Sequence, residues 1–163
     1  SDNPMADPLR LKPALDTDQP TEDVLSEIHV LANLIGQGFS GYLETEQGLT
    51  VAEWRVMLAL GRHPGQTATE ITERWAMDKM AISRALQRLE SAGHIRRDRN
   101  QQDRRSYRLS LTDEGKILHD RILPGATARY RDFMSCLNEQ EISQLRNALH
   151  KLIDHAKETQ EWP

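Results

Sequence analysis

The segment from Asp78 to Thr112 constrains this chain most, because it combines an amphipathic helix, a glycine stop and a charged hairpin. Between Asp78 and Ala92 apolar residues recur at helical spacing, with polar and basic residues between them. Asp78 can cap the first turn, and Gly93 follows the last, where glycine adopts a left-handed conformation at least cost. One face of this helix is therefore predicted to join a core, and the other is free for a partner.

After this glycine the pattern becomes that of two short strands. Ile95 begins the first, and Tyr107, Leu109 and Leu111 alternate with polar residues on the second. The intervening segment, residues 98–105, has no apolar side chain, so we predict an exposed tip that reaches toward a negatively charged partner. Its basic residues are Arg99, Arg104 and Arg105.

The charge of the chain is unevenly distributed. From Arg74 to Arg108 ten basic residues face four acidic ones, about +6, whereas the rest carries about −10 and the whole chain −4. A basic helix face and hairpin on an otherwise acidic protein predict a surface that binds a polyanion.

Composition limits the other possibilities. Apolar residues make up 37% and aromatic residues 5% of 163 residues, which is low for a self-sufficient globule and favours a core completed by a second subunit. No apolar run approaches the roughly 20 residues of a membrane span, so we expect a soluble, cytoplasmic protein without a membrane partner. The single cysteine, Cys136, excludes an internal disulfide and is expected to be a buried packing residue. The histidines show no metal-ligand spacing, and no catalytic motif is present, so we expect no metal, no cofactor and no enzyme.

Four regions are predicted along the chain. Residues 1–20 are rich in proline and predict a flexible tail. Residues 21–48 predict a long amphipathic helix loosened by glycines, residues 49–112 the domain that contains the helix and hairpin, and residues 113–160 two further helices. In the last region Pro124 predicts a kink or break.

Two capping boxes precede the central helix, one formed by Thr50 and Glu53 and the other by Thr67 and Glu70. Only two residues then separate Trp75 from the cap at Asp78. Two helices joined so tightly, the second basic on its outer face, predict a helix-turn-helix. The fold class is therefore mainly α with a small β-hairpin wing (α+β), a winged helix-turn-helix domain plus a helical dimerisation region formed by both chain ends.

The runs LTVAEWRVMLAL, ITERWAMDKMAISRALQRLE and SAGHIRRDRNQQDRRSYRLSLTDEG, between Leu49 and Gly115, resemble the multiple antibiotic resistance regulator (MarR) family of bacterial transcription factors. The most specific features are the wing-tip residues 103–105, followed by Leu111, Thr112 and Gly115. The resemblance implies a homodimer in which each subunit presents one winged helix-turn-helix to double-stranded DNA, with the recognition helix in the major groove and Arg104 in the minor groove. It further implies that Asp103 orients the wing through ion pairs, with Arg105 as partner.

The expected DNA-binding residues thus come from the recognition helix 78–92 and the wing 95–111. They are Lys79, Ser83, Arg84, Arg88, Arg99, Asp103, Arg104 and Arg105. Arg96 and Arg97 are left open between phosphate contact and plain solvation.

Many members of the family bind a small, often aromatic or phenolic, organic effector between the dimer region and the winged domain. By position, Gln37, Trp54 and Leu58 would lie near that cleft, although Trp54 and Trp75 also suit a core. The expected function is a sequence-specific, ligand-responsive homodimeric repressor of a pseudo-palindromic operator. The alternative is a ligand-binding or protein-interaction module on the same scaffold that does not bind DNA.

Overall fold

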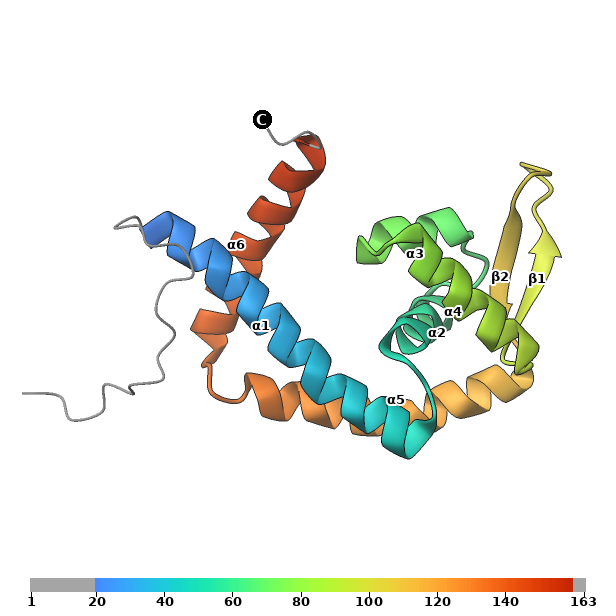
Figure 1. Ribbon diagram of the computed structural model, residues 1–163, viewed down its shortest axis with the longest axis horizontal. Helices are drawn as coiled ribbons and strands as arrows, with labels where there is room; N and C mark the ends of the chain where they lie inside the picture. The colour runs from blue at the N-terminus through green and yellow to red at the C-terminus, as the bar shows by residue number, and fades with distance from the viewer. Residues whose placement is uncertain (1–19, 160–163) are drawn as a thin grey trace, which may run out of the picture. The chain divides into compact units, whose positions relative to one another are not determined.

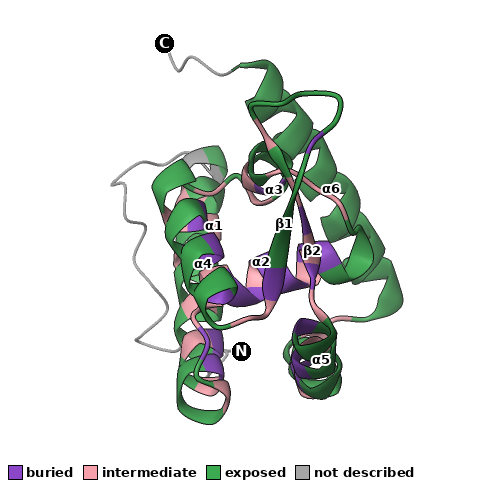
Figure 2. Cartoon of the chain, turned by 90° about the vertical axis from the view of Figure 1, so that its right-hand side faces the viewer, coloured by how far each residue is buried: buried purple, intermediate pink, exposed green. Residues whose placement is uncertain are grey.

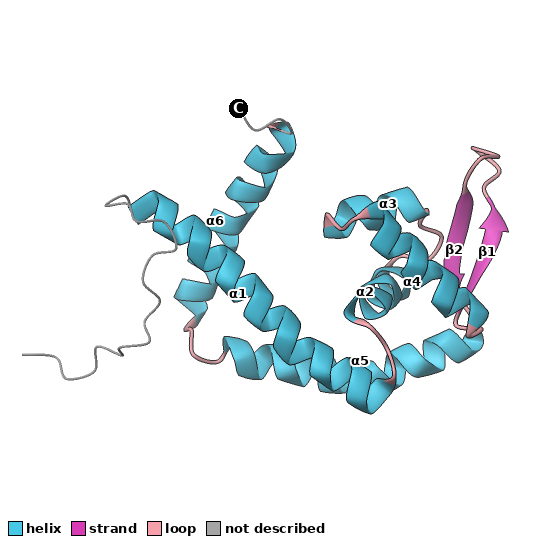
Figure 3. Cartoon of the chain, in the orientation of Figure 1, coloured by secondary structure: helices cyan, strands magenta, loops and turns pink. Residues whose placement is uncertain are grey.

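The computed structural model describes residues 20–159, and it is mainly helical with one two-stranded hairpin (Figures 1 and 3). The expected mainly α fold with a small β-hairpin is confirmed. The elements follow in the order α1 (Pro20–Tyr42), the π-helical turn η1 (Leu43–Gln47), α2 (Val51–Arg62), α3 (Ala68–Trp75), α4 (Lys79–Ser91), β1 (Ile95–Arg99), β2 (Tyr107–Leu111), α5 (Asp113–Met134) and α6 (Glu139–Glu158). The expected tail at residues 1–20 lies outside the described residues, except that Pro20 begins α1. The chain divides into two compact units, and the boundary along the chain falls between Ile117 and Leu118, inside α5.

The core of the first unit lies where α2 and α4 pack against each other and against the base of the hairpin (Figure 2). α2 contributes its fully buried face, and α4 contributes the apolar stripe that its helical spacing predicts. The largest fully buried side chains here include Trp54, Met57, Leu60, Ile71, Ile82, Leu86, Leu89 and Leu109.

The helix boundaries are determined by local capping. Thr50 with Glu53 forms a complete capping box at α2, and Thr67 with Glu70 forms another at α3, as predicted. Asp78 accepts a hydrogen bond from the backbone amide of Ala81 and so begins α4. These caps satisfy amide donors that the first turn of a helix leaves without partners.

Neither the glycines of α1 nor Pro124 of α5 interrupts its helix. α1 continues through its three glycines to Tyr42, and it ends in η1, after which Gly48 adopts a left-handed conformation with φ of 66°. α5 continues through Pro124, so of the predicted kink or break the break does not occur. Proline removes one amide donor and crowds the carbonyl four residues before it, but the hydrogen bonds on either side keep a long helix continuous.

The hairpin is antiparallel, with Ile95 opposite Leu111 and Arg99 opposite Tyr107. Leu109 also exchanges backbone hydrogen bonds with the α2–α3 loop, donating to Gln66 O at 2.8 Å and accepting from Gly65 N at 2.8 Å. The first strand extends further than predicted, because residues 98 and 99 pair within the sheet and the loop is confined to residues 100–106.

In the second unit, α5 from Leu118 onward buries Leu118, Ile122 and Ala126, whereas α6 has no buried residue. α6 begins with a complete capping box of Asn138 and Glu141. The expectation that Cys136 is buried is wrong, because it is exposed in the turn before α6. Throughout residues 20–159, no helix combines the length and apolar character needed to cross a membrane.

Candidate nucleic-acid interface

α3 and α4 form the predicted helix-turn-helix. α3 ends at Trp75, and the capping residue Ala76 is left-handed, with φ of 48° and ψ of 38°. The amide of Met77 donates to Thr72 O at 3.3 Å. Only glycine adopts this conformation without steric cost, so the turn at Ala76 is retained by surrounding packing. Asp78 then begins α4 at once, which makes the connection as tight as the sequence indicates.

The turn is fastened to α2 by Arg55 and Trp75. The Trp75 indole donates from Nε1 to the Arg55 carbonyl at 3.1 Å, and the Arg55 guanidinium lies 5.4 Å from the centre of the Trp75 ring. Arg55 also donates from Nη1 to Sδ of Met77 at 3.4 Å. These contacts hold the turn, and therefore the start of α4, in a defined place.

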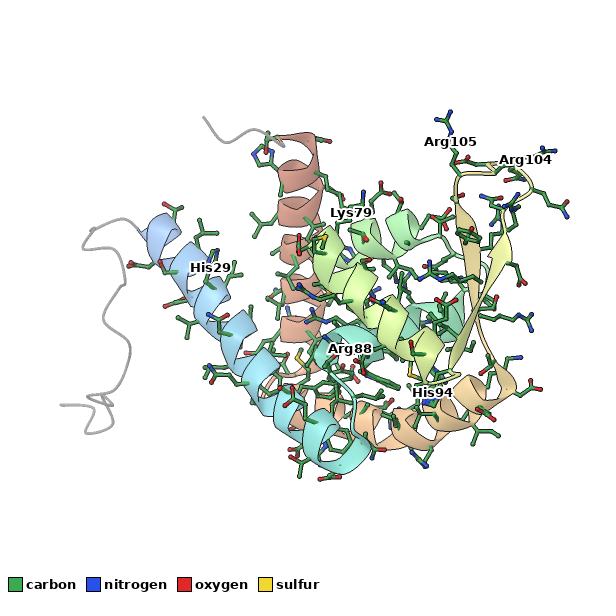
Figure 4. All side chains as sticks on the ribbon, turned by 45° about the vertical axis from the view of Figure 1, so that its right-hand side comes forward. His29, Lys79, Arg88, His94, Arg104 and Arg105 are labelled. Atoms are coloured by element: carbon green, nitrogen blue, oxygen red, sulfur yellow. The ribbon has the colours of Figure 1, made fainter. Side chains whose placement is uncertain are left out.

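α4 places the predicted DNA-binding residues on the face opposite its buried stripe. Lys79, Ser83, Arg84 and Arg88 are all exposed. Lys79 and Arg88 lie near opposite ends of this helix (Figure 4). Among the described residues the guanidinium or ammonium groups of Lys79 and Arg84 make no ion pair, so both are available to an anionic partner.

Arg88 is held differently from the other basic residues of α4. It donates from Nη1 to Oε1 of Glu53 at 3.3 Å, and its side chain stays 57% exposed, whereas that of Glu53 is only 7% exposed. Glu53 is therefore both the capping residue of α2 and an anchor for α4. Part of the donor capacity of Arg88 is used within the protein.

The base of the wing is neutralised by its own ion pairs. Arg97 donates to Glu90 of α4 at 2.6 Å, and Arg96 lies 3.4 Å from Asp98. The sequence left open whether these two arginines contact phosphate or are simply solvated. In the structure both have carboxylate partners within the protein. Arg99 is exposed at the end of β1.

The wing tip presents Arg104 and Arg105 to solvent, and Figure 4 shows both pointing away from the ribbon. Asp103 does not orient the tip through an ion pair with Arg105 as expected. Its carboxylate Oδ1 instead accepts the backbone amide of Arg105 at 3.0 Å, while its carbonyl accepts the amide of Ser106. This Asx turn folds the tip through the backbone and leaves the Arg105 guanidinium outside it.

Two residues that the sequence analysis did not single out hold the wing in place. Asn100 is 6% exposed, and its side chain donates to Ser106 and accepts from the amide of Gln102. Arg108 donates from Nε to Asn100 at 3.3 Å, from Nη1 to Gly65 O at 3.0 Å and from Nη2 to Gln102 at 3.0 Å. Strand alternation put Arg108 on the face away from the core but could not identify these partners.

The residues expected near an effector differ in exposure. Gln37 is exposed on α1, Leu58 is partly buried on α2, and Trp54 is fully buried one turn before Leu58. The burial of Trp54 agrees with a core residue. Within residues 20–159, no group of three or more His, Cys, Asp or Glu side chains is arranged to hold a metal ion.

Comparison with known proteins relates this arrangement to one family. A sequence profile described as the MarR family matches residues 47–106, from just before α2 to the wing tip. The HTH-type transcriptional repressor MdtR of Bacillus subtilis (strain 168) is 36% identical over 112 residues, which are 69% of this chain and 72% of the repressor. This relative is a transcription regulator and not an enzyme.

Solved structures of MarR-family regulators have the same fold. A MarR/EmrR family transcriptional regulator from Acinetobacter sp. ADP1 superposes with a TM-score of 0.79 and 25% identity, over 86% of this chain and 99% of that one. The PcaV transcriptional regulator from Streptomyces coelicolor, determined in complex with its natural ligand, superposes with a TM-score of 0.68 and 25% identity, over 82% of this chain and 96% of that one.

Proposed function

The chain belongs to the MarR family of DNA-binding transcriptional regulators, and we propose that it is a homodimeric, ligand-responsive repressor of a pseudo-palindromic operator. We propose repression rather than activation because the relative MdtR is a transcriptional repressor. The dimer, the operator symmetry, the individual DNA contacts and the effector are parts of this proposal. So is its location in the cytoplasm, where bacterial DNA is found.

The observation that carries the proposal is the placement of unpaired cations on two separate elements of one compact unit. Lys79 and Arg84 extend from α4, and Arg104 and Arg105 extend from the wing tip, without an ion pair to any described residue. The arginines nearer the hairpin base are instead neutralised by carboxylates. Exposed cations without an ion pair on both the tip and α4 suit a polyphosphate partner.

On DNA, α4 would occupy the major groove and the wing the adjoining minor groove. Arg84 suits bidentate contact with guanine, whereas Arg104 suits the negative potential of a narrow, A·T-rich minor groove. Lys79, Ser83, Arg88, Arg99 and Arg105 would contact phosphates or bases nearby, and Asp103 would shape the tip. In this division, residues 49–112 form the DNA-binding domain.

Dimerisation is proposed for residues 21–48 and 113–160, because both carry large apolar side chains that this chain does not cover. On α1 these are Val24, Leu25, Leu31, Leu34 and Ile35, and on α6 they are Ile142, Leu145, Leu149, Leu152 and Ile153, with exposures of 36–57%. Apolar surface of this extent is typical of a protein interface. A two-fold dimer would select half-sites about one helical turn, roughly 10 bp, apart.

The effector is proposed to be a small organic molecule, with aromatic or phenolic acids as the expected classes. PcaV was solved with a natural ligand, and the similarity of the fold supports a comparable regulation here. Gln37, Leu58 and the buried Trp54 remain the residues proposed to lie near the effector. A scaffold that binds ligand or protein but not DNA is the rival, and the unpaired tip arginines argue against it.

Selection of bound duplexes from a random DNA pool, at near-physiological salt and read by sequencing, tests the proposal. We expect enrichment of a palindrome with two half-sites, and affinity that falls steeply as salt rises because bound phosphates release counterions. Analytical ultracentrifugation of the same sample establishes its dimeric state. A folded dimer that enriches no sequence would contradict the proposal and favour the rival.

A further inference from the structure

The centre of the outward face of α4 is occupied by Met80, Arg84 and Gln87, and Lys79 and Arg88 lie toward its two edges. A helix turns about 100° per residue, so Met80, Arg84 and Gln87, at positions i, i+4 and i+7, follow one line. The buried residues Ile82 and Leu89 lie on the opposite line. All three members of the outer line are exposed.

Met80 is the unusual member of this line. Met80 is 60% exposed, whereas every other large apolar residue of α4 is buried. Its neighbours on the exposed face are polar or basic, so Met80 does not belong to an apolar patch of the extent that a protein partner requires. An isolated apolar group within a polar, cationic face suits an isolated apolar group on an otherwise polar, anionic partner.

The major groove offers one such group, the C5-methyl of thymine, which is the apolar feature of its edge. Met80 lies in the first turn of α4, and the N-terminal residues of a recognition helix are those that contact base edges. The unbranched thioether of methionine adapts to a small apolar surface. Arg84 and Gln87 along the same line have the donors and acceptors to contact guanine and adenine, respectively.

We propose that the line Met80–Arg84–Gln87 is the sequence-reading surface of α4, and that Met80 determines specificity by packing on a thymine methyl group. This inference rests on the proposed function. From Met80 to Gln87 the helix rises about 10 Å, which spans about three base pairs. The thymine therefore lies within about three base pairs of the positions that Arg84 and Gln87 contact, in each half-site.

A deoxyuridine scan tests this, because deoxyuridine lacks only the methyl group of thymidine and pairs identically. Each thymidine of the selected operator is replaced in turn, symmetrically in both half-sites, and affinity is measured by fluorescence anisotropy. We expect one position per half-site at which the replacement lowers the affinity of the parent protein for the operator about three- to tenfold. This is the range expected for one buried methyl contact. Thymidines outside the half-sites serve as internal controls.

Two variants attribute the effect to Met80. M80A should bind the thymidine and deoxyuridine operators equally, whereas M80L should retain the preference because leucine preserves the apolar contact. Both should unfold at the parent temperature, since the side chain is exposed. A flat scan, or a preference that persists in M80A, overturns the proposal while the enriched palindrome still establishes a DNA-binding regulator. Failure to enrich any operator overturns both this inference and the proposed function.

Discussion

Glu53 of α2 and Arg88 of α4 form an ion pair, with 3.3 Å between Oε1 and Nη1. The same carboxylate group accepts the backbone amide of Thr50 through Oε2 at 3.3 Å, which closes the capping box of α2. One buried side chain thus completes the cap of α2 and anchors α4. The position of the recognition helix depends on a residue that does not face the proposed DNA surface.

Replacement of Glu53 by alanine should lower the free energy of unfolding by about 1–2 kcal/mol. The lost cap contributes about 1 kcal/mol, and the ion pair contributes less than that because Arg88 is mostly exposed. Chemical denaturation measures the change. Glu70→Ala is the matched control, because Glu70 has the same role in an exposed capping box and no ion pair within residues 20–159. Equal losses in the two variants would show that the Arg88 pair contributes nothing.

Gly115 should not tolerate a side chain. A Cβ atom at Gly115 would collide with the carbonyl oxygen of His94, which also accepts the amide of Thr112 at 3.0 Å. Gly115→Ala should therefore destabilise the protein by about 1–3 kcal/mol, as forced overpacking does. Gly41→Ala is the control, since a Cβ atom at Gly41 would meet no atom of the described chain within 4 Å and alanine favours a helix. A melting temperature unchanged by Gly115→Ala would refute the close approach.

Replacement of Arg108 by lysine should loosen the wing without unfolding the protein. A single ammonium group cannot serve the three acceptors that the guanidinium of Arg108 holds. We expect several-fold faster trypsin cleavage at Arg104 and Arg105, together with weaker operator binding. Arg96→Lys is the control, because the partner of Arg96 is Asp98 in its own strand. Unchanged cleavage at the tip would mean that Arg108 does not restrain it.

The wing and the recognition helix should contribute differently to DNA binding. Arg104→Ala should weaken binding and flatten the preference for A·T-rich flanks, because a minor-groove arginine responds to groove width. Arg84→Ala should instead relax the choice of base within the half-site by about 1–3 kcal/mol. Competition assays with duplexes altered at the flank or at the half-site distinguish the two effects. Parent-like binding by both variants would show that the surface is assigned wrongly.

Introduction of charge into the apolar stripe of α6 should disrupt the proposed dimer. Leu152 is 52% exposed in the single chain, and a carboxylate there would be buried without a partner on association. We expect the parent protein to sediment as a dimer at micromolar concentration and Leu152→Glu to sediment as a monomer. Lys151→Glu, one residue away on a different face, should remain dimeric. A monomeric parent protein would exclude this part of the proposal.

Local sequence patterns were sufficient to predict those structural roles that depend on neighbours in the sequence. The capping residues Thr50, Thr67 and Asp78, the glycine at position 93 and the tight connection after Trp75 were all predicted correctly. Each depends on hydrogen bonds or backbone conformations within about four residues. The exposed face of α4 followed for the same reason, since helical periodicity assigns faces without knowledge of the partner.

Predictions that required distant partners were less successful. Asp103 was expected to pair with a guanidinium but binds a backbone amide, and Cys136 was expected to be buried but is exposed. The count of basic residues in the sequence also treated Arg88, Arg97 and Arg108 in the same way as Arg84. In the structure the first three are held by acceptors within the protein. A count of charges cannot distinguish a cation that is engaged from one that is available.

The sequence by itself therefore determined the order of helices, their caps, the helix-turn-helix and the presence of a basic wing. These follow from short-range hydrogen bonding and from the period of apolar residues. The tertiary structure decided which cations remain available, since the partners Glu53 and Gly65 lie 35 and 43 residues from Arg88 and Arg108, respectively. Folding brings such pairs together in space, and a local sequence pattern cannot predict them.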